Sequence, residues 1–197
     1  REVWSWAGYD FANSGYTTVV LTAVFSAYFV SAVANDATWA TPVWTVILAV
    51  SNAAVMLSMP IIGAYADVHA RKQWLLRIST IGCVLATAAL ALAGRGDIAI
   101  AVVAVIISNF FFQVGGSLIG AFLPEIARPQ ALGKVSGWGW SFGYLGGLAT
   151  LALCLGYVIW AEAQGKSAEQ YVPVTMLITA AVFALAALPA LTILRER

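Results

Sequence analysis

The order of apolar and polar residues divides the chain into six long apolar stretches separated by short polar breaks. Each stretch has about 20 residues or more, the length an α-helix needs to cross a bilayer. Pro42 and Pro173 lie at the expected starts of the second and sixth helices, where a first turn tolerates proline. We therefore predict one six-helix transmembrane domain over residues 1–197, with spans at 4–32, 42–66, 74–94, 97–122, 135–160 and 171–194.

The composition agrees with an all-α polytopic membrane protein. Hydrophobic residues make up 61% of the chain and charged residues 10%, too few polar side chains to cover a water-soluble protein. The net charge of +1 gives no indication of a nucleic-acid partner. Cys83 and Cys154 lie in the middle of apolar stretches, so we expect each to be a small hydrophobic residue rather than half of a disulfide.

The basic residues predict the orientation, because Lys and Arg are retained on the cytoplasmic side of a membrane. Only Arg95 and Lys166 fall on one predicted side. The other side holds the remaining eight: Arg1, Arg71, Lys72, Arg77, Arg128, Lys134, Arg195 and Arg197. We expect both termini to be cytoplasmic and the breaks at 33–41, 94–97 and 161–170 to face outward.

Two apolar stretches carry a polar face. Asp10, Asn13 and Thr17 follow an i, i+3, i+7 pattern, and the other face consists of Asn109, Gln113 and Ser117. Asp10 lies about 9 Å along a helix from Trp4, within the cytoplasmic third of a core roughly 30 Å thick. Such residues either line a pathway for a solute or ion or hold helices together by hydrogen bonds, and Asp10 could also pair with Lys134 or a backbone donor.

The break after the second stretch reads GAYADVHARKQWL, residues 63–75. With Gly63, Asp67, Arg71 and Lys72 it resembles the signature of the major facilitator superfamily in the same loop. The resemblance implies a gating loop, in which Gly63 permits close helix contact and the basic pair meets head groups or a carboxylate. The sequence departs from the signature at Tyr65, Val68 and Ala70, the last replacing a glycine, which weakens the charge network.

Three further pieces, SWAGYDFANSGY, FLPEIA and VSGWGWSFGYLGG, are similar to a bacterial branch of that superfamily related to the autophagy-related vacuolar amino-acid effluxers. They lie in order on the first, fourth and fifth stretches and extend the resemblance over almost the whole chain. It implies one half of a twelve-span transporter, built from two inverted three-helix repeats whose first and fourth spans line a central cavity. Asp10, Asn13, Thr17, Asn109, Gln113 and Ser117 are then the pathway residues.

The fifth stretch is rich in glycine. Gly139, Gly143 and Gly147 repeat every four residues, a spacing that lets another helix approach closely. Close packing alone accounts for the pattern; the resemblance adds that this helix moves against a neighbour during alternating access.

The sequence favours transport over catalysis. It contains no catalytic triad, no metal-ligand cluster and no phosphate-binding glycine loop, so we expect no enzyme activity, no metal and no cofactor. We predict secondary transport of a small polar solute, with amino acids suggested by the resemblance, in a bacterial inner membrane. The second six-helix half would come from the same longer chain, from a homodimer or from a separate subunit. The alternative is a structural or assembly subunit of a larger membrane complex.

Overall fold

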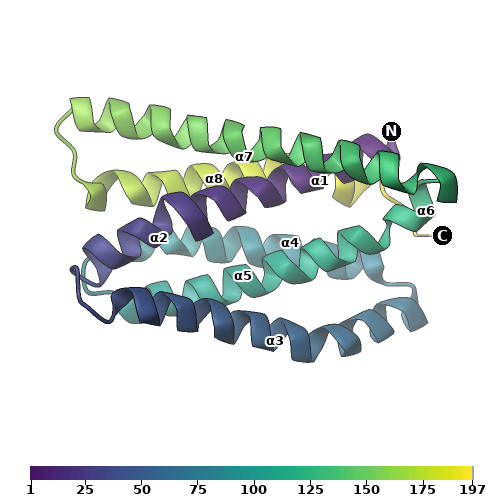
Figure 1. The fold of residues 1–197 in the computed structure, drawn as a ribbon, viewed down its shortest axis with the longest axis horizontal. Helices are drawn as coiled ribbons and strands as arrows, with labels where there is room; N and C mark the ends of the chain where they lie inside the picture. Colours follow the sequence, from purple (N-terminus) through teal and green to yellow (C-terminus); the bar gives the residue numbers. More distant parts are fainter. Residues whose placement is uncertain (197) are drawn as a thin grey trace.

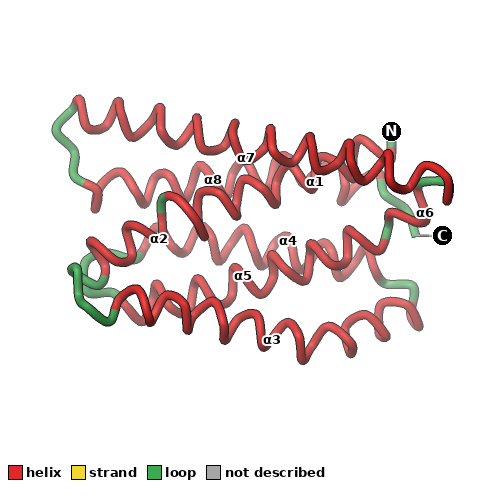
Figure 2. The backbone as a smooth tube through the Cα atoms, in the orientation of Figure 1, coloured by secondary structure: helices red, strands yellow, loops and turns green. Residues whose placement is uncertain are grey.

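The computed structural model describes residues 1–196, and within this range the chain is a bundle of helices with no strand (Figure 2). Arg197, one of the eight basic residues grouped above, lies outside the described residues. Six segments of this range are long and apolar enough to cross a membrane, as the sequence predicts: Glu2–Val33, Ala40–His69, Lys72–Leu92, Ile98–Ile126, Pro129–Ala163 and Ala168–Ile193. The chain is thus an integral membrane protein whose helices satisfy their backbone hydrogen bonds internally.

Most spans consist of one long helix. The second to fourth are α3 (Ala40–His69), α4 (Lys72–Ala89) with the 3₁₀ turn η3 (Leu90–Leu92), and α5 (Ile98–Ala121) with the short α6 (Leu123–Ile126). The fifth is the 3₁₀ turn η4 (Pro129–Ala131) with α7 (Leu132–Ala163), and the sixth is α8 (Ala168–Ile193).

The first span departs from the single helix that its apolar pattern predicts. It runs through α1 (Glu2–Tyr16), the π-helix η1 (Thr17–Ala23), α2 (Phe25–Tyr28) and the π-helix η2 (Phe29–Val33). In η1 the Thr22 hydroxyl donates to the Thr17 carbonyl oxygen five residues earlier, at 3.0 Å. Wide turns of this kind occur frequently at functional sites. They leave no mark in hydropathy, because the apolar run continues through them.

The sixth helix starts earlier than expected. Ser167 and Gln170 form a capping box, in which the Ser167 backbone N–H donates to Gln170 Oε1 at 3.1 Å, so α8 begins at Ala168. Pro173 therefore lies inside α8 and not in its first turn, which corrects the prediction. Pro42 does fall in the first turn of α3.

The two ends of the bundle separate the basic residues as expected. Both termini, the α3–α4 connection and α6 lie at one end, and the connections that precede α3, α5 and α8 lie at the other (Figure 1). Arg71, Lys72 and Arg128 are thus at the end with the termini, and Arg95 and Lys166 are at the opposite end.

The helices form two layers. Across the near side of the bundle in Figure 1 run α7, the first span, α5 and α3, with α8 and α4 behind them. We call the near side, with α1 and α5 at its centre, the front face. The first span packs against α7 and α8, α5 packs against α3 and α4, and α4 packs against α8. If spans one, two and three are exchanged with spans four, five and six, the same pairs of spans remain in contact. Two inverted repeats give this arrangement.

Buried polar side chains fix α1 against the layer behind it and against α5. Tyr9 Oη lies 3.0 Å from Thr80 Oγ1 of α4, and Tyr16 Oη lies 2.7 Å from Ser108 Oγ of α5. The Trp6 indole N–H donates to the Ile119 carbonyl oxygen at 2.8 Å. Because these sides of α1 pack against α4 and α5, the side that bears Asp10 faces the front of the bundle.

Candidate functional site

The polar face of α1 opens to the front of the bundle. Asp10 and Asn13 are half-buried and Thr17 is exposed, with its hydroxyl donating to the Asn13 carbonyl oxygen at 3.1 Å. Asp10 forms no ion pair with Lys134 or any other basic residue in the range 1–196. The structure therefore does not show the pairing with Lys134 that was one alternative for Asp10.

Asn13 stands where the two predicted polar faces meet. A methyl group on Gly116 of α5 would lie 3.6 Å from Asn13 Nδ2, so α1 and α5 are adjacent here, and Ser117 is the next residue. The buried Asn13 Oδ1 has no hydrogen-bond partner among the described residues. A buried amide oxygen without a hydrogen-bond partner is costly.

The polar face of α5 is tied to α3 by amides. Asn109, which is buried, donates to Ser51 Oγ at 3.0 Å and to Asn52 Oδ1 at 3.2 Å. Gln113 donates to the same Asn52 oxygen, and Ser117 is exposed beyond it. Asn109 thus joins helices, whereas Gln113 and Ser117 extend the polar face toward the opening.

A groove follows the front side of the contact between the first span and α7. At the end with the termini, a pocket of about 150 Å³ is lined by Asp10, Ser14, Trp140 and Tyr144. A second pocket of about 270 Å³ adjoins it and shares two of these residues; its lining is Ser14, Thr17, Thr18, Tyr144, Gly147 and Leu148. The groove is polar on its α1 wall and aromatic to aliphatic on its α7 wall.

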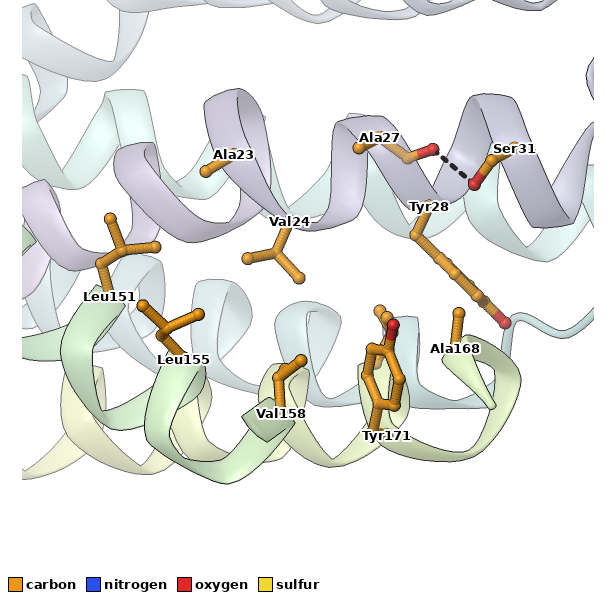
Figure 3. Close-up of a pocket in the computed structure, with 11 residues that line it drawn as sticks. Ala23, Val24, Ala27, Tyr28, Ser31, Leu151, Leu155, Val158, Ala168 and Tyr171 are labelled. Atoms are coloured by element: carbon orange, nitrogen blue, oxygen red, sulfur yellow. Dashed lines mark hydrogen bonds between the residues drawn. The ribbon is translucent and has the colours of Figure 1, made fainter. Parts of the chain in front are cut away.

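Farther from the termini, the first span separates from α7, and the groove between them becomes apolar. A cavity of about 470 Å³ lies there between η1, α2, α7 and the start of α8 (Figure 3). Val24, Leu151, Leu155 and Val158 point into it, with the Tyr28 and Tyr171 rings at its far side. The Tyr28 hydroxyl donates to the Ala93 carbonyl oxygen at 3.1 Å, so its polar tip is turned away from the space.

The glycines of the fifth span lie on the same contact. A methyl on Gly143 would come within 2.7 Å of Asp10 Oδ2 and 2.9 Å of Ser14 Oγ, and one on Gly147 would lie 2.8 Å from Thr18 Oγ1. At Gly139 it would collide with the Trp6 ring. The absence of side chains at these positions is what brings α7 against the polar wall of α1.

The signature loop forms a charge bridge at the end of the bundle with the termini. Lys72 Nζ lies 3.2 Å from Asp67 Oδ1 and 2.9 Å from Glu125 Oε1 of α6, so one ammonium joins the end of α3 to the end of the fourth span. Arg71 instead lies over the Trp74 ring, 5.7 Å from its centroid. The carboxylate expected near the basic pair is thus Glu125.

Within residues 1–196, Gly63 makes no close contact with another helix. A methyl group there would meet nothing within 4 Å, so among the described residues no helix approaches it. The reason is the position of α3 at the edge of the bundle, where most of its surface has no neighbour in this chain.

The structure adds residues that sequence reasoning did not single out: Asn52, Glu125, Trp140 and Tyr144. Asn52 lies in an adjacent Ser-Asn pair within an apolar stretch, a signal that was available. Trp140 and Tyr144 were quoted only as part of a motif, and nothing in the sequence separates the front of α7 from its other sides. No cluster of three or more His, Cys, Asp or Glu that could hold a metal occurs in the part of the chain the structure describes.

Comparison with known proteins agrees with the arrangement. Residues 40–133 match the family model described as "Vacuole effluxer Atg22 like". The chain is also 27% identical over 198 residues to the "Uncharacterized MFS-type transporter YxiO" of Bacillus subtilis (strain 168), covering 98% of this chain and 46% of that protein. The chain is thus similar, over nearly its whole length, to a protein described as a major facilitator transporter. No solved structure matches it.

These two matches confirm the resemblance that the loop signature and the three sequence pieces indicate. The matched family is described as effluxers and the matched protein as a transporter, and this similarity supports a role in membrane transport. The chain spans about half the length of the curated relative it matches.

Proposed function

We propose that this chain is the N-terminal half of a secondary transporter that moves a small polar solute by alternating access. The solute would pass between the front face and a second six-helix half. The observation that carries the proposal is the polar strip on that face, where Asp10 lacks a basic partner and Asn13 Oδ1 lacks a hydrogen bond among the described residues. A carboxylate and free amide are costly against lipid and are found facing a protein interior or water.

Two facts support a second half. The relative is about twice as long as this chain, and the polar side chains of the front face would be costly against lipid. Amino acids are the solute class we propose, because the matching family model describes vacuole effluxers and the earlier resemblance points to amino-acid effluxers. By the distribution of basic residues, the termini would be cytoplasmic in a bacterial inner membrane.

Within this proposal the residues have distinct parts. Asp10, Asn13, Thr17, Gln113 and Ser117 would contact the solute or a coupled ion, and Asn109 would hold α5 to α3. Asp67, Arg71 and Lys72 would act in gating, and Gly139, Gly143 and Gly147 would let α7 shift against α1.

Cysteine accessibility in membranes tests the proposal. In the whole transporter with Cys83 and Cys154 replaced by Ala, we expect Thr17→Cys and Ser117→Cys to react with a small water-soluble thiol reagent. Both positions are exposed on the front face, in the apolar depth of the bundle. Leu85→Cys and Leu185→Cys are matched controls on α4 and α8, since both leucines are exposed on the layer behind and should face lipid.

Reaction at the front positions and not at the controls would support a water-filled pathway. If all four cysteines stay unreactive, the front face is dry and covered, which contradicts transport through it and favours a structural subunit.

A further inference from the structure

The pocket beside Asp10 has a distinctive composition. Its lining combines one carboxylate, one hydroxyl and two aromatic rings, from Asp10, Ser14, Trp140 and Tyr144. The two rings are one helical turn apart on α7, with centroids 6.2 Å apart and planes inclined at 63°. The lining of this pocket is therefore both aromatic and anionic.

The aromatic pair lies on the groove and is separate from the other tryptophans nearby. Trp138 is only two residues from Trp140, but two residues correspond to about 200° around a helix. It therefore points to another side of α7, where it packs edge-on against Trp4 with a centroid distance of 6.4 Å. Trp140 and Tyr144 are 64% and 66% exposed, so their rings are free to receive a ligand.

Charge decides which ligand fits. Asp10 has no ion-pair partner within residues 1–196, and it lies in a membrane span where an uncompensated carboxylate is unfavourable. Aromatic faces attract cations through the ring quadrupole, and a carboxylate beside them adds charge attraction. A lone carboxylate would repel an anionic group at this place.

We infer that the Asp10, Trp140 and Tyr144 pocket binds the ammonium group of the transported solute, so that the substrate is an organic amine or a zwitterion that enters amine first. This inference rests on the proposed transport function and names the chemical class of its substrate. At about 150 Å³ the pocket is smaller than the 300–1,000 Å³ typical of sites for whole ligands. It takes a head group, and the adjoining pocket with Thr17 and Thr18 receives the remainder of the solute.

The test uses the purified whole transporter and two pairs of probes: choline with its neutral isostere 3,3-dimethylbutan-1-ol, and ethanolamine with propan-1-ol. Binding is measured by calorimetry, which needs no transport. We expect at least one amine to bind about tenfold more tightly than its neutral counterpart, as cation–π and charge attraction together would give.

Variants test which residues produce the preference for amines. Asp10→Asn and Trp140→Leu should each weaken amine binding about tenfold, while Tyr144→Phe, which keeps the ring, should retain it. Trp138→Leu is the matched control, because it removes a tryptophan two residues away whose exposure, 60%, is similar. It should leave amine binding unchanged.

Equal binding of amines and neutral isosteres would overturn the inference, and so would equal losses in Trp140→Leu and Trp138→Leu. Failure here is distinct from failure of the transport proposal. If Thr17→Cys and Ser117→Cys are reactive but neither amine is preferred, the pathway stands and the ammonium site falls.

Discussion

Ala70 ends α3 in a left-handed backbone conformation, with φ 50° and ψ 52°. A residue with a Cβ is strained there by about 1 kcal/mol, whereas glycine adopts this region freely. The departure from the loop signature, which has glycine at this position, therefore falls where glycine is physically useful.

We expect Ala70→Gly to stabilise the protein by about 1 kcal/mol, measured as a rise in the midpoint of thermal unfolding in detergent. Ala64→Gly is the control: Ala64 is also exposed on α3 but lies in its helical interior, where glycine costs up to about 1 kcal/mol. A lower midpoint for Ala70→Gly would show that the left-handed turn is not strained.

At the scale of elements, the contact between α1 and α7 depends on the missing side chains of α7. A methyl on Gly146 would lie 2.6 Å from the Phe11 Cα atom, and backbone cannot move aside as a side chain can. A methyl on Gly156, in the same helix, would meet nothing within 4 Å.

Gly146→Ala should thus lower the free energy of unfolding by about 1–3 kcal/mol through overpacking. Gly156→Ala should leave it unchanged or raise it by up to about 1 kcal/mol through helix propensity. Unfolding by denaturant in a mild detergent measures both. Equal effects in the two variants would mean that α7 is not held against α1 as the structure has it.

The Lys72 bridge connects two elements through carboxylates in different surroundings. The Glu125 side chain is 15% exposed and that of Asp67 is 69% exposed. Water screens the Asp67 pair, so its contribution is below about 1 kcal/mol, whereas a charged hydrogen bond like that of Glu125 contributes about 1.5–3 kcal/mol.

Glu125→Gln should therefore destabilise the fold more than Asp67→Asn does, as judged by thermal unfolding. Asp67→Asn should fold nearly normally and, if the loop gates transport, should reduce solute flux through the whole transporter. Normal flux in Asp67→Asn would remove this residue from the gating mechanism.

The elements that could be predicted from sequence are those with a local signal. Apolar length determines the six spans, and the four-residue spacing of Gly139, Gly143 and Gly147 indicates a close contact, although not its partner. The π-helical turns of the first span could not be predicted, since they preserve hydropathy.

Contacts between side chains on different helices could not be predicted from the sequence. Asn52 between Asn109 and Gln113, and Glu125 beside Lys72, are about 60 and 50 residues away from their partners. Gly63 shows the converse: a signature glycine suggested a helix contact, and α3 lies at the edge of the bundle, where no contact with Gly63 occurs within residues 1–196. Contacts between distant segments follow from three-dimensional packing, which a single sequence does not encode locally.

At the scale of the whole molecule, the unequal distribution of basic residues between the two ends of the bundle predicts which end is accessible from outside the cell. In a background without Cys83 and Cys154, we expect Asp36→Cys and Ser167→Cys to be labelled from outside the cell by an impermeant thiol reagent. His69→Cys should be labelled only after the membrane is permeabilised, because its end of the bundle carries most of the basic residues. The opposite pattern would reverse the proposed orientation.

The exchange of neighbours between the first three spans and the last three also bears on how such a molecule arises. A unit with an odd number of spans that is copied in tandem must insert its copy upside down, since the chain begins the copy on the other side of the membrane. A unit with six spans returns to the side where it started, so a tandem copy keeps the same orientation. Duplication of a three-helix ancestor followed by duplication of the product would therefore generate first an inverted pair and then two halves with matching ends. No rearrangement of the charges on the loops is needed for the second step.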